Sequence, residues 1–315
     1  MKHKIWLFAL PLAAAVVFSF ILPYAASFGE AFRGARQITI LQNDSLLHIT
    51  IFTLKQAFFS VILSLVIGLP GAWFLGTSRS RFTSLLRTLT AVPFAMPSIL
   101  VVLGFVLFYG NSGWISHIYP LKVLYKPEAI ILAHGFFNFP LVVRLAGDGL
   151  ARARKAYAPA AASMGASPFV TALTVLLPLG LPAIMSACLL VFLYSFTSFA
   201  VVLVLGGGPA STTLAVEIYR HARIFLNYPN AGALALMETI IAILVFLCFV
   251  YFGKKSGEIK TDLQERTMDE RKRSVPVLVV MCVYGVLAAI FILGPILSIL
   301  LESFLFRTTR SASQL

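Results

Sequence analysis

The sequence predicts an all-α polytopic membrane protein. Of its 315 residues, 59% are hydrophobic and 12% are charged, whereas soluble domains average about 25% charged residues. A helix that crosses a bilayer needs about 20 mostly apolar residues. About seven segments meet this requirement, and the spans they predict are 5–26, 50–75, 85–109, 129–146, 184–205, 231–252 and 277–301.

The placement of basic residues predicts the orientation of these spans. With a cytoplasmic N-terminus, 16 Lys and Arg residues fall in the inside segments and eight in the outside segments. Cytoplasmic loops of membrane proteins carry an excess of Lys and Arg, so this orientation is favoured. The net charge of +13 is then a property of membrane topology, and we expect the lipid bilayer as a partner and no nucleic acid.

The first three spans have simple interpretations. The apolar run at 5–26 is longer than the 7–15-residue core of a cleaved signal peptide, so it is predicted to be a retained span. Prolines such as Pro70, Pro93 and Pro97 are tolerated in bundled membrane helices, because neighbouring helices re-satisfy the freed backbone groups. Gln56 is predicted to lie at the outer end of the second span, with its side chain reaching toward the membrane surface.

The stretch between the fourth and fifth spans is the most informative. Residues 160–164 are small or flexible helix formers, and Gly165 is the residue type that ends a helix in the left-handed conformation. Ser167 and Pro168 are typical of an N-cap and a first helical position. This pattern predicts a helix, a tight turn and a second, short helix held at the membrane surface, after which Pro178 bends the chain into the fifth span.

The spacing of this stretch resembles the cytoplasmic coupling loop of ABC importer permeases. It reads Ala160-Ala161, Gly165, nine residues, Val175, one residue, Leu177-Pro178. The family has Glu where this chain has Pro159, and the alternative is an ordinary connector between two membrane helices. The resemblance implies a type I ABC importer transmembrane domain whose loop docks on a dimer of a separate ATP-binding cassette subunit. The residues it assigns to ATPase coupling are Ala160, Ala161, Ser163, Met164, Gly165, Leu177 and Pro178.

Two further stretches narrow this resemblance. AMPSILVVLGFVLFYGNSGW and FTSFAVVLVLGGGPASTTLAVEIY are similar to the thiamine and ferric-iron branch of these importers, whose permeases are fused doubles. The resemblance implies a multi-pass protein of the bacterial inner membrane that receives a small solute from a periplasmic solute-binding protein. Thiamine is the first expectation, and ferric iron or another solute is the alternative.

ATP chemistry is not expected in this chain itself. The glycines at 206–208 are not followed by the Lys-Ser/Thr pair that a phosphate loop requires, and no Walker-type motif occurs elsewhere. We therefore expect a transport subunit that is not an enzyme, has no catalytic residues and binds no cofactor. ATP and Mg²⁺ would be used by the partner subunit. The three cysteines fall within predicted spans and lack metal-ligand spacing, so no metal site is expected.

The chain is predicted to have three parts. Residues 1–253 form a first six-span permease unit, with the coupling loop near 148–180. Residues 254–275 form a charged cytoplasmic linker, and residues 276–315 form the first span of an incomplete second unit. A Pro, a Glu and a Phe in the first span and its flank recur 272 positions later at Pro295, Glu302 and Phe304, as a duplicated unit would require.

Four polar residues in the predicted spans are candidates for a substrate pathway: Asn138, Ser195, Ser198 and Glu238. Glu238 is the acid in the middle of a span, and such a charge usually faces a cavity or a partner. Its carboxylate suits a thiazolium cation such as thiamine, and the alternative is pairing with another helix. His134 and Asn138 share one helix face. For Asn138 and the two serines, the alternative is hydrogen bonding between helices.

Two other classes of protein remain as rivals. An ion-driven secondary transporter would be expected to carry several intramembrane acids, and this chain offers Glu238 alone at mid-span. A membrane enzyme would require a cluster of nucleophile, base and metal ligands, which the spacing of residues does not suggest.

Overall fold

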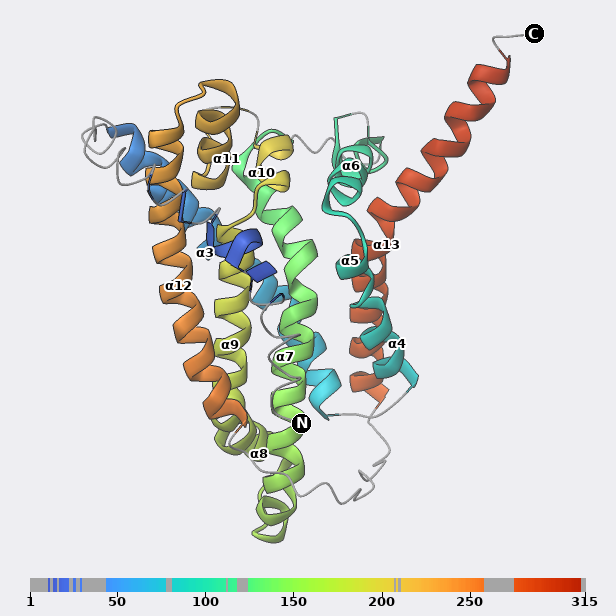
Figure 1. Ribbon diagram of the computed structural model, residues 1–315. Helices are drawn as coiled ribbons and strands as arrows, with labels where there is room; N and C mark the ends of the chain where they lie inside the picture. Colours follow the sequence, from blue (N-terminus) through green and yellow to red (C-terminus); the bar gives the residue numbers. More distant parts are fainter. Residues whose placement is uncertain are drawn as a thin grey trace.

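The computed structural model describes residues 44–77, 81–111, 113–117, 124–206, 208, 211–257 and 275–312, with scattered positions between 11 and 29. Within these residues the chain is helical and contains no strand, so the predicted all-α fold is confirmed. Long helices run between two opposite ends of the molecule (Figure 1). The predicted first span, 5–26, lies largely outside the described residues, apart from the short η1 (Val17–Ile21).

Five described helices are long and apolar enough to cross a membrane. In Figure 1, three of them descend along the chain direction and two ascend. The descending helices are α3 (Asp44–Thr77), α7 (Pro127–Ser163) and α12 (Tyr228–Gly257). The ascending helices are α13 (Val275–Ala312) and the run of α8 (Pro168–Thr171), η3 (Ala172–Leu176) and α9 (Leu177–Phe196).

The predicted third span, 85–109, is three pieces rather than one helix. They are α4 (Arg81–Leu89), α5 (Val92–Ala95) and α6 (Ser98–Tyr109). Pro93 lies in the first turn of α5 and Pro97 is the N-cap of α6. Proline has no N–H to donate, so it is best accommodated in the first turn or at the cap of a helix. Each of these prolines therefore lies at the start of a new helix.

The fifth span differs from its predicted bounds of 184–205. Its helix begins at Pro168, ends at Phe196, and is separated by 197–199 from α10 (Ala200–Leu205). Pro178 does not end a separate surface helix, because a π-turn precedes it, with the Leu177 N–H bonded to the Ala172 carbonyl. A wider turn gives room for a proline ring that would clash with the carbonyl four residues earlier.

Shorter elements gather at the end opposite the α7–α8 turn. They are α10, η2 (Ile115–His117), α11 (Leu214–Tyr219) and η5 (Arg220–Ile224). In Figure 1, α10 and α11 lie at the upper end, beside the start of α7. We call this the outer end, following the predicted orientation.

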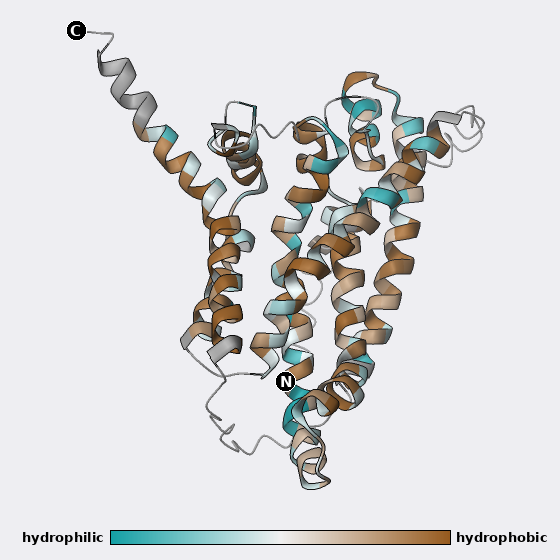
Figure 2. Ribbon diagram, turned by 180° about the vertical axis from the view of Figure 1, so that it is seen from behind, coloured by the Kyte–Doolittle hydropathy of each residue, from teal (hydrophilic) through white to brown (hydrophobic). Residues whose placement is uncertain are grey.

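The main core lies between α3, α6, α7 and α13. The most extensive helix contact joins α3 and α7. Phe105 and Phe136 are buried with ring centroids 5.2 Å apart, and Phe291 of α13 meets Phe136 at 5.7 Å. The outward faces of α12 and α13 remain apolar and exposed, as the brown colour in Figure 2 shows. Such faces suit lipid or another membrane helix.

Candidate functional site

The turn between α7 and α8 has the geometry that the sequence predicts. Gly165 has a φ of +77°, in the left-handed region. Its N–H donates to the Ala162 carbonyl and the Ala166 N–H donates to the Ala161 carbonyl, both at 3.0 Å. These two bonds form a Schellman motif, which satisfies the last carbonyls of a helix. The predicted left-handed helix end at Gly165 is therefore confirmed.

The second half of the turn is also confirmed. Ser167 is the N-cap of α8, with its Oγ accepting from the Val170 N–H at 3.3 Å, and Pro168 occupies the first turn. Leu176 is buried against Leu150 and Ala153 of α7, which holds the two arms of the hairpin together. We call residues 157–178 the coupling hairpin.

The coupling hairpin carries an exposed apolar surface at the lower end of the molecule. It extends beyond the ends of the other helices drawn in colour (Figure 1). The Met164 side chain is 82% exposed and Phe169 is 72% exposed. Large apolar side chains in such positions mark a site of contact with another protein or a membrane.

The structure separates the predicted coupling residues into two groups. Ala161 is buried inside the hairpin, and Ser163 bonds its own helix through the Pro159 carbonyl at 3.0 Å. The other six predicted coupling residues, Ser163 among them, are exposed. They are Ala160, Ser163, Met164, Gly165, Leu177 and Pro178. Sequence reasoning did not single out Phe169 as a coupling residue, although its position after the Ser-Pro cap could have indicated an exposed face.

Two of the predicted pathway residues form a buried polar cluster between helices. Asn138 Nδ2 of α7 donates to Ser195 Oγ of α9 at 3.0 Å. Gln56 Nε2 of α3 donates to the Ser195 carbonyl at 2.8 Å. Ser60 and His134 meet at 3.2 Å between their Oγ and Nδ1 atoms. The cluster thus joins three helices, and both Asn138 and His134 make hydrogen bonds to neighbouring helices.

Gln56 does not lie at the membrane surface as predicted. Its side chain is 2% exposed, because its amide group donates to the last turn of α9 rather than to water. Ser195 is the second-last residue of α9, so its carbonyl belongs to the group that a helix leaves without an intrahelical partner. One turn earlier on α3, Thr53 Oγ1 accepts from the Leu214 N–H at the start of α11, at 3.1 Å.

Glu238 and Ser198 lie apart from this cluster. Ser198 is half-buried in the break between α9 and α10. Glu238 lines an open-sided groove of about 600 Å³ between α9, α11 and α12. We call it the Glu238 groove; its other lining residues are Leu193, Thr197, Phe199, Ala215, Ile218, Ala235, Thr239, Ala242, Ile243 and Phe246.

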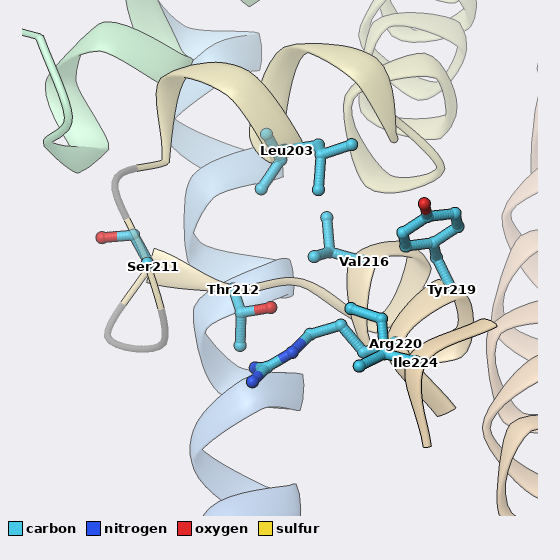
Figure 3. A pocket seen from close by; sticks show the side chains of 9 residues that line it. Leu203, Ser211, Thr212, Val216, Tyr219, Arg220 and Ile224 are labelled. Carbon is cyan, nitrogen blue, oxygen red and sulfur yellow. The ribbon is translucent and has the colours of Figure 1, made fainter. Parts of the chain in front are cut away.

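A second hollow of about 250 Å³ lies at the outer end (Figure 3). Leu203 and Val216 line one part of it, and Thr212 and Arg220 line another. Arg220 is held in place because its Nη1 donates to Glu217 Oε1 at 2.7 Å, and its guanidinium lies 5.6 Å from the centre of the Phe225 ring.

Solved structures define the class of this fold. A bacterial ABC transporter that imports the acidic polysaccharide alginate matches with a TM-score of 0.65 at 16% identity, over 82% of this chain and 98% of that one. The methionine ABC transporter MetNI, in an inward-facing conformation, matches with a TM-score of 0.53 at 18% identity, over 70% and 100% of the two chains. The fold is that of a type I ABC importer transmembrane domain.

Curated relatives agree with this class. The thiamine transport system permease of Haemophilus influenzae is 30% identical over 65% of this chain and 39% of its own length. The thiamine transport system permease of Escherichia coli is 30% identical over 84% of this chain and 50% of its own length. The spermidine/putrescine permease PotB of Salmonella typhimurium is 28% identical over 68% of this chain and 76% of its own length. The chain therefore spans half or less of the length of these two thiamine permeases.

The chain belongs to the family of binding-protein-dependent transport system inner membrane components, whose model matches residues 68–255. The resemblance to ABC importer permeases, and to thiamine permeases among them, is confirmed. A permease component of this family is a multi-pass inner membrane protein and is not itself the catalytic subunit.

Proposed function

We propose that this chain is the membrane-spanning permease of an ATP-driven importer that passes a small solute from a periplasmic binding protein to the cytoplasm. The coupling hairpin carries the proposal. It combines a rigid turn with exposed Met164 and Phe169 at the far end of α7. A separate ATPase dimer, which uses ATP and Mg²⁺, would bind this surface and move the helices behind it.

Thiamine is the first candidate solute. Two of the matched relatives are named as thiamine permeases and a third as a spermidine/putrescine permease. Thiamine and the polyamines are organic cations at neutral pH, so an organic cation is the shared chemistry. Ferric iron or another solute remains the alternative. An ion-driven secondary transporter is the rival class, and uptake that persists without ATP but stops with a proton uncoupler would favour it.

The orientation belongs to the same proposal. The excess of Lys and Arg on the side of the coupling hairpin favours a cytoplasmic hairpin and a cytoplasmic N-terminus. We also propose that α13 is the first span of a second permease unit, which follows residues 1–253 and the linker at 254–275. The recurrence of Pro295, Glu302 and Phe304 at a fixed offset supports this division.

Cross-linking tests the partner. A cysteine at Met164 should cross-link in cells to the ATP-binding cassette subunit, since this side chain is 82% exposed. A cysteine at Ala161, which is 3% exposed and faces into the hairpin, is the matched control and should not. Labelling of the Met164 cysteine by a membrane-impermeant reagent from outside would contradict the proposal.

Coupling is tested by a change at the turn. Gly165→Pro should uncouple ATP hydrolysis from solute uptake in vesicles while leaving membrane insertion intact, because proline cannot adopt a positive φ. Gly165→Asn should retain most coupled uptake, since asparagine tolerates the left-handed conformation. Coupled uptake that is unchanged in Gly165→Pro would argue against a coupling role for this hairpin.

A further inference from the structure

We propose that the Glu238 groove is a recognition site for an organic cation, with the carboxylate as the counter-ion and Phe199 and Phe246 as aromatic walls. This inference rests on the proposed transport function and assigns the chemical class of its solute. It depends on three observations. Glu238 lies deep in α12 with no partner among the described residues, the groove offers hydrogen-bond acceptors, and the Phe199–Tyr219 ring pair joins the groove to the outer hollow.

Glu238 lies deep in the apolar part of α12 and has no partner among the residues that the structure describes. The apolar part of α12 runs from Tyr228 to Lys254, so Glu238 is about 15 Å along the helix from the outer end at 1.5 Å per residue. Among the described residues, no hydrogen bond or ion pair reaches its carboxylate. An acid at this depth is costly to maintain and is by default assigned to a ligand or ion pathway.

The groove offers acceptors and no side-chain donors. The Thr197 hydroxyl donates its hydrogen to the Leu193 carbonyl at 2.9 Å, and the Thr239 hydroxyl donates to the Ala235 carbonyl at 2.7 Å. Each threonine therefore faces the groove with oxygen lone pairs alone. Among the described residues, no Lys, Arg, His, Asn or Gln lines the groove. An anionic solute would meet only repulsion there, whereas a cation would meet a negative charge and hydroxyl oxygens.

Aromatic rings complete the groove. Phe199 is 37% exposed and Phe246 is 48% exposed, so both have ring surface available to a ligand. The negative face of an aromatic ring attracts ammonium groups, and quaternary ammonium ligands are commonly bound in this way. The groove volume of about 600 Å³ falls within the range typical of small-molecule sites.

The groove is adjacent to the outer hollow. Phe199 lines the groove and Tyr219 lines the outer hollow, and their ring centroids are 5.1 Å apart. The two hollows therefore share an aromatic wall. Figure 3 shows Tyr219 at one side of the outer hollow and the Arg220 guanidinium at another. The Phe199–Tyr219 pair therefore lies between the outer hollow and the Glu238 groove.

Equilibrium binding to the purified chain in lipid nanodiscs tests the proposal. The probes are radiolabelled thiamine and spermidine, with maltose as an uncharged comparison. The wild-type chain should bind both cations and not maltose. Glu238→Gln should weaken cation binding about tenfold or more, because one partner of a poorly solvated charge pair is lost. Glu128→Gln, the same change at an exposed acid outside the groove, should leave the affinity unchanged.

A second pair of variants tests the aromatic wall. Phe246→Leu keeps an apolar side chain and removes the ring, so it should weaken cation binding about threefold. Phe249→Leu is the matched control. The Phe249 and Phe246 ring centroids are 6.1 Å apart, but Phe249 is not among the residues that line the groove. Loss of affinity in both variants alike would indicate a general disturbance of α12 and would overturn the assigned role of Phe246.

Other outcomes would also overturn the inference. If Glu238→Gln binds both cations as the wild type does, or if the wild type binds neither, the groove is not the cation site. If Glu238→Gln instead lowers thermal stability without changing affinity, the carboxylate stabilises the fold and is not the counter-ion of the cation. These assays need no ATPase. A negative result together with Met164 cross-linking to the ATPase would therefore leave the proposed transport function standing.

Discussion

At the scale of single residues, α3 supplies hydrogen bonds to the ends of other helices. Gln56 meets the last turn of α9 and Thr53 meets the first residue of α11. Ser60 donates its hydrogen to the Gln56 carbonyl at 2.7 Å, and its oxygen is then free to accept from His134 Nδ1 in the tautomer that carries the proton there. The α9–α10 break and its return into α11 are thus held by one face of α3.

The two buried serines of α3 should respond differently to substitution. Ser60→Ala would leave His134 Nδ1–H without an acceptor, and we expect a loss of roughly 0.5–2 kcal/mol. Ser64 is buried with no partner for its hydroxyl among the described residues, so Ser64→Ala should be neutral or stabilising. Thermal unfolding in detergent measures both, and equal responses would contradict the assigned hydrogen bond.

This cluster was only partly predictable. The four-residue spacing of His134 and Asn138 indicates a shared face, because that is a property of any helix. Their partners on α3 and α9 depend on how the three helices are aligned, which is set by contacts far apart in the sequence. The placement of Gln56 was wrong for the same reason, since its acceptor lies 139 residues away.

At the scale of elements, the coupling hairpin was predictable and the neighbouring spans were not. Gly165, Ser167 and Pro168 act through local backbone bonds, so their meaning can be read within a few residues. The extent of the fifth span depends on a π-turn before Pro178 and on a break after Phe196. Neither feature interrupts the apolar run of the sequence, and hydropathy alone therefore placed the span too late.

The cap of α8 provides a prediction at this scale. Ser167→Ala should destabilise the hairpin locally by about 1 kcal/mol, because the Val170 N–H loses its acceptor. Ser163→Ala is the matched control, since that exposed hydroxyl bonds only within its own helix. Amide hydrogen exchange of residues 169–171 in detergent should become faster in the first variant alone. Equal exchange rates in both variants would show that the cap is unimportant.

At the scale of the whole molecule, α13 is docked on the unit that precedes it. Tyr284 Oη donates to the Ile67 carbonyl of α3 at 3.0 Å, close to Pro70. Ser298 Oγ lies 3.3 Å from the Gly104 carbonyl oxygen of α6 and 2.7 Å from the Pro295 carbonyl oxygen of its own helix, so both acceptors compete for its single hydrogen. Where α6 and α13 meet, a Cβ on Gly104 would clash with the Pro295 carbonyl oxygen, so the close approach requires glycine.

We therefore predict that α13 stays bound when its covalent link is cut. A protease site inserted in 258–274 should yield two fragments that co-purify in detergent, held by the contacts with α3 and α6. Gly104→Ala should release the α13 fragment or markedly reduce its recovery. Gly253→Ala is the control, because a Cβ there meets nothing closer than 4.0 Å. Separation of the fragments in the parent chain would contradict this docking.

The length of α7 has a mechanical consequence. Its 37 residues contain no non-helical position, although Pro140 and Pro159 lie inside the helix. The tip beside Met164 and the level of Asn138 therefore belong to one continuous helix and are about 39 Å apart along its axis. The two prolines are the positions at which this helix bends most readily. Displacement of the tip would therefore act on the hydrogen bond between Asn138 of α7 and Ser195, which lies one residue before α9 ends.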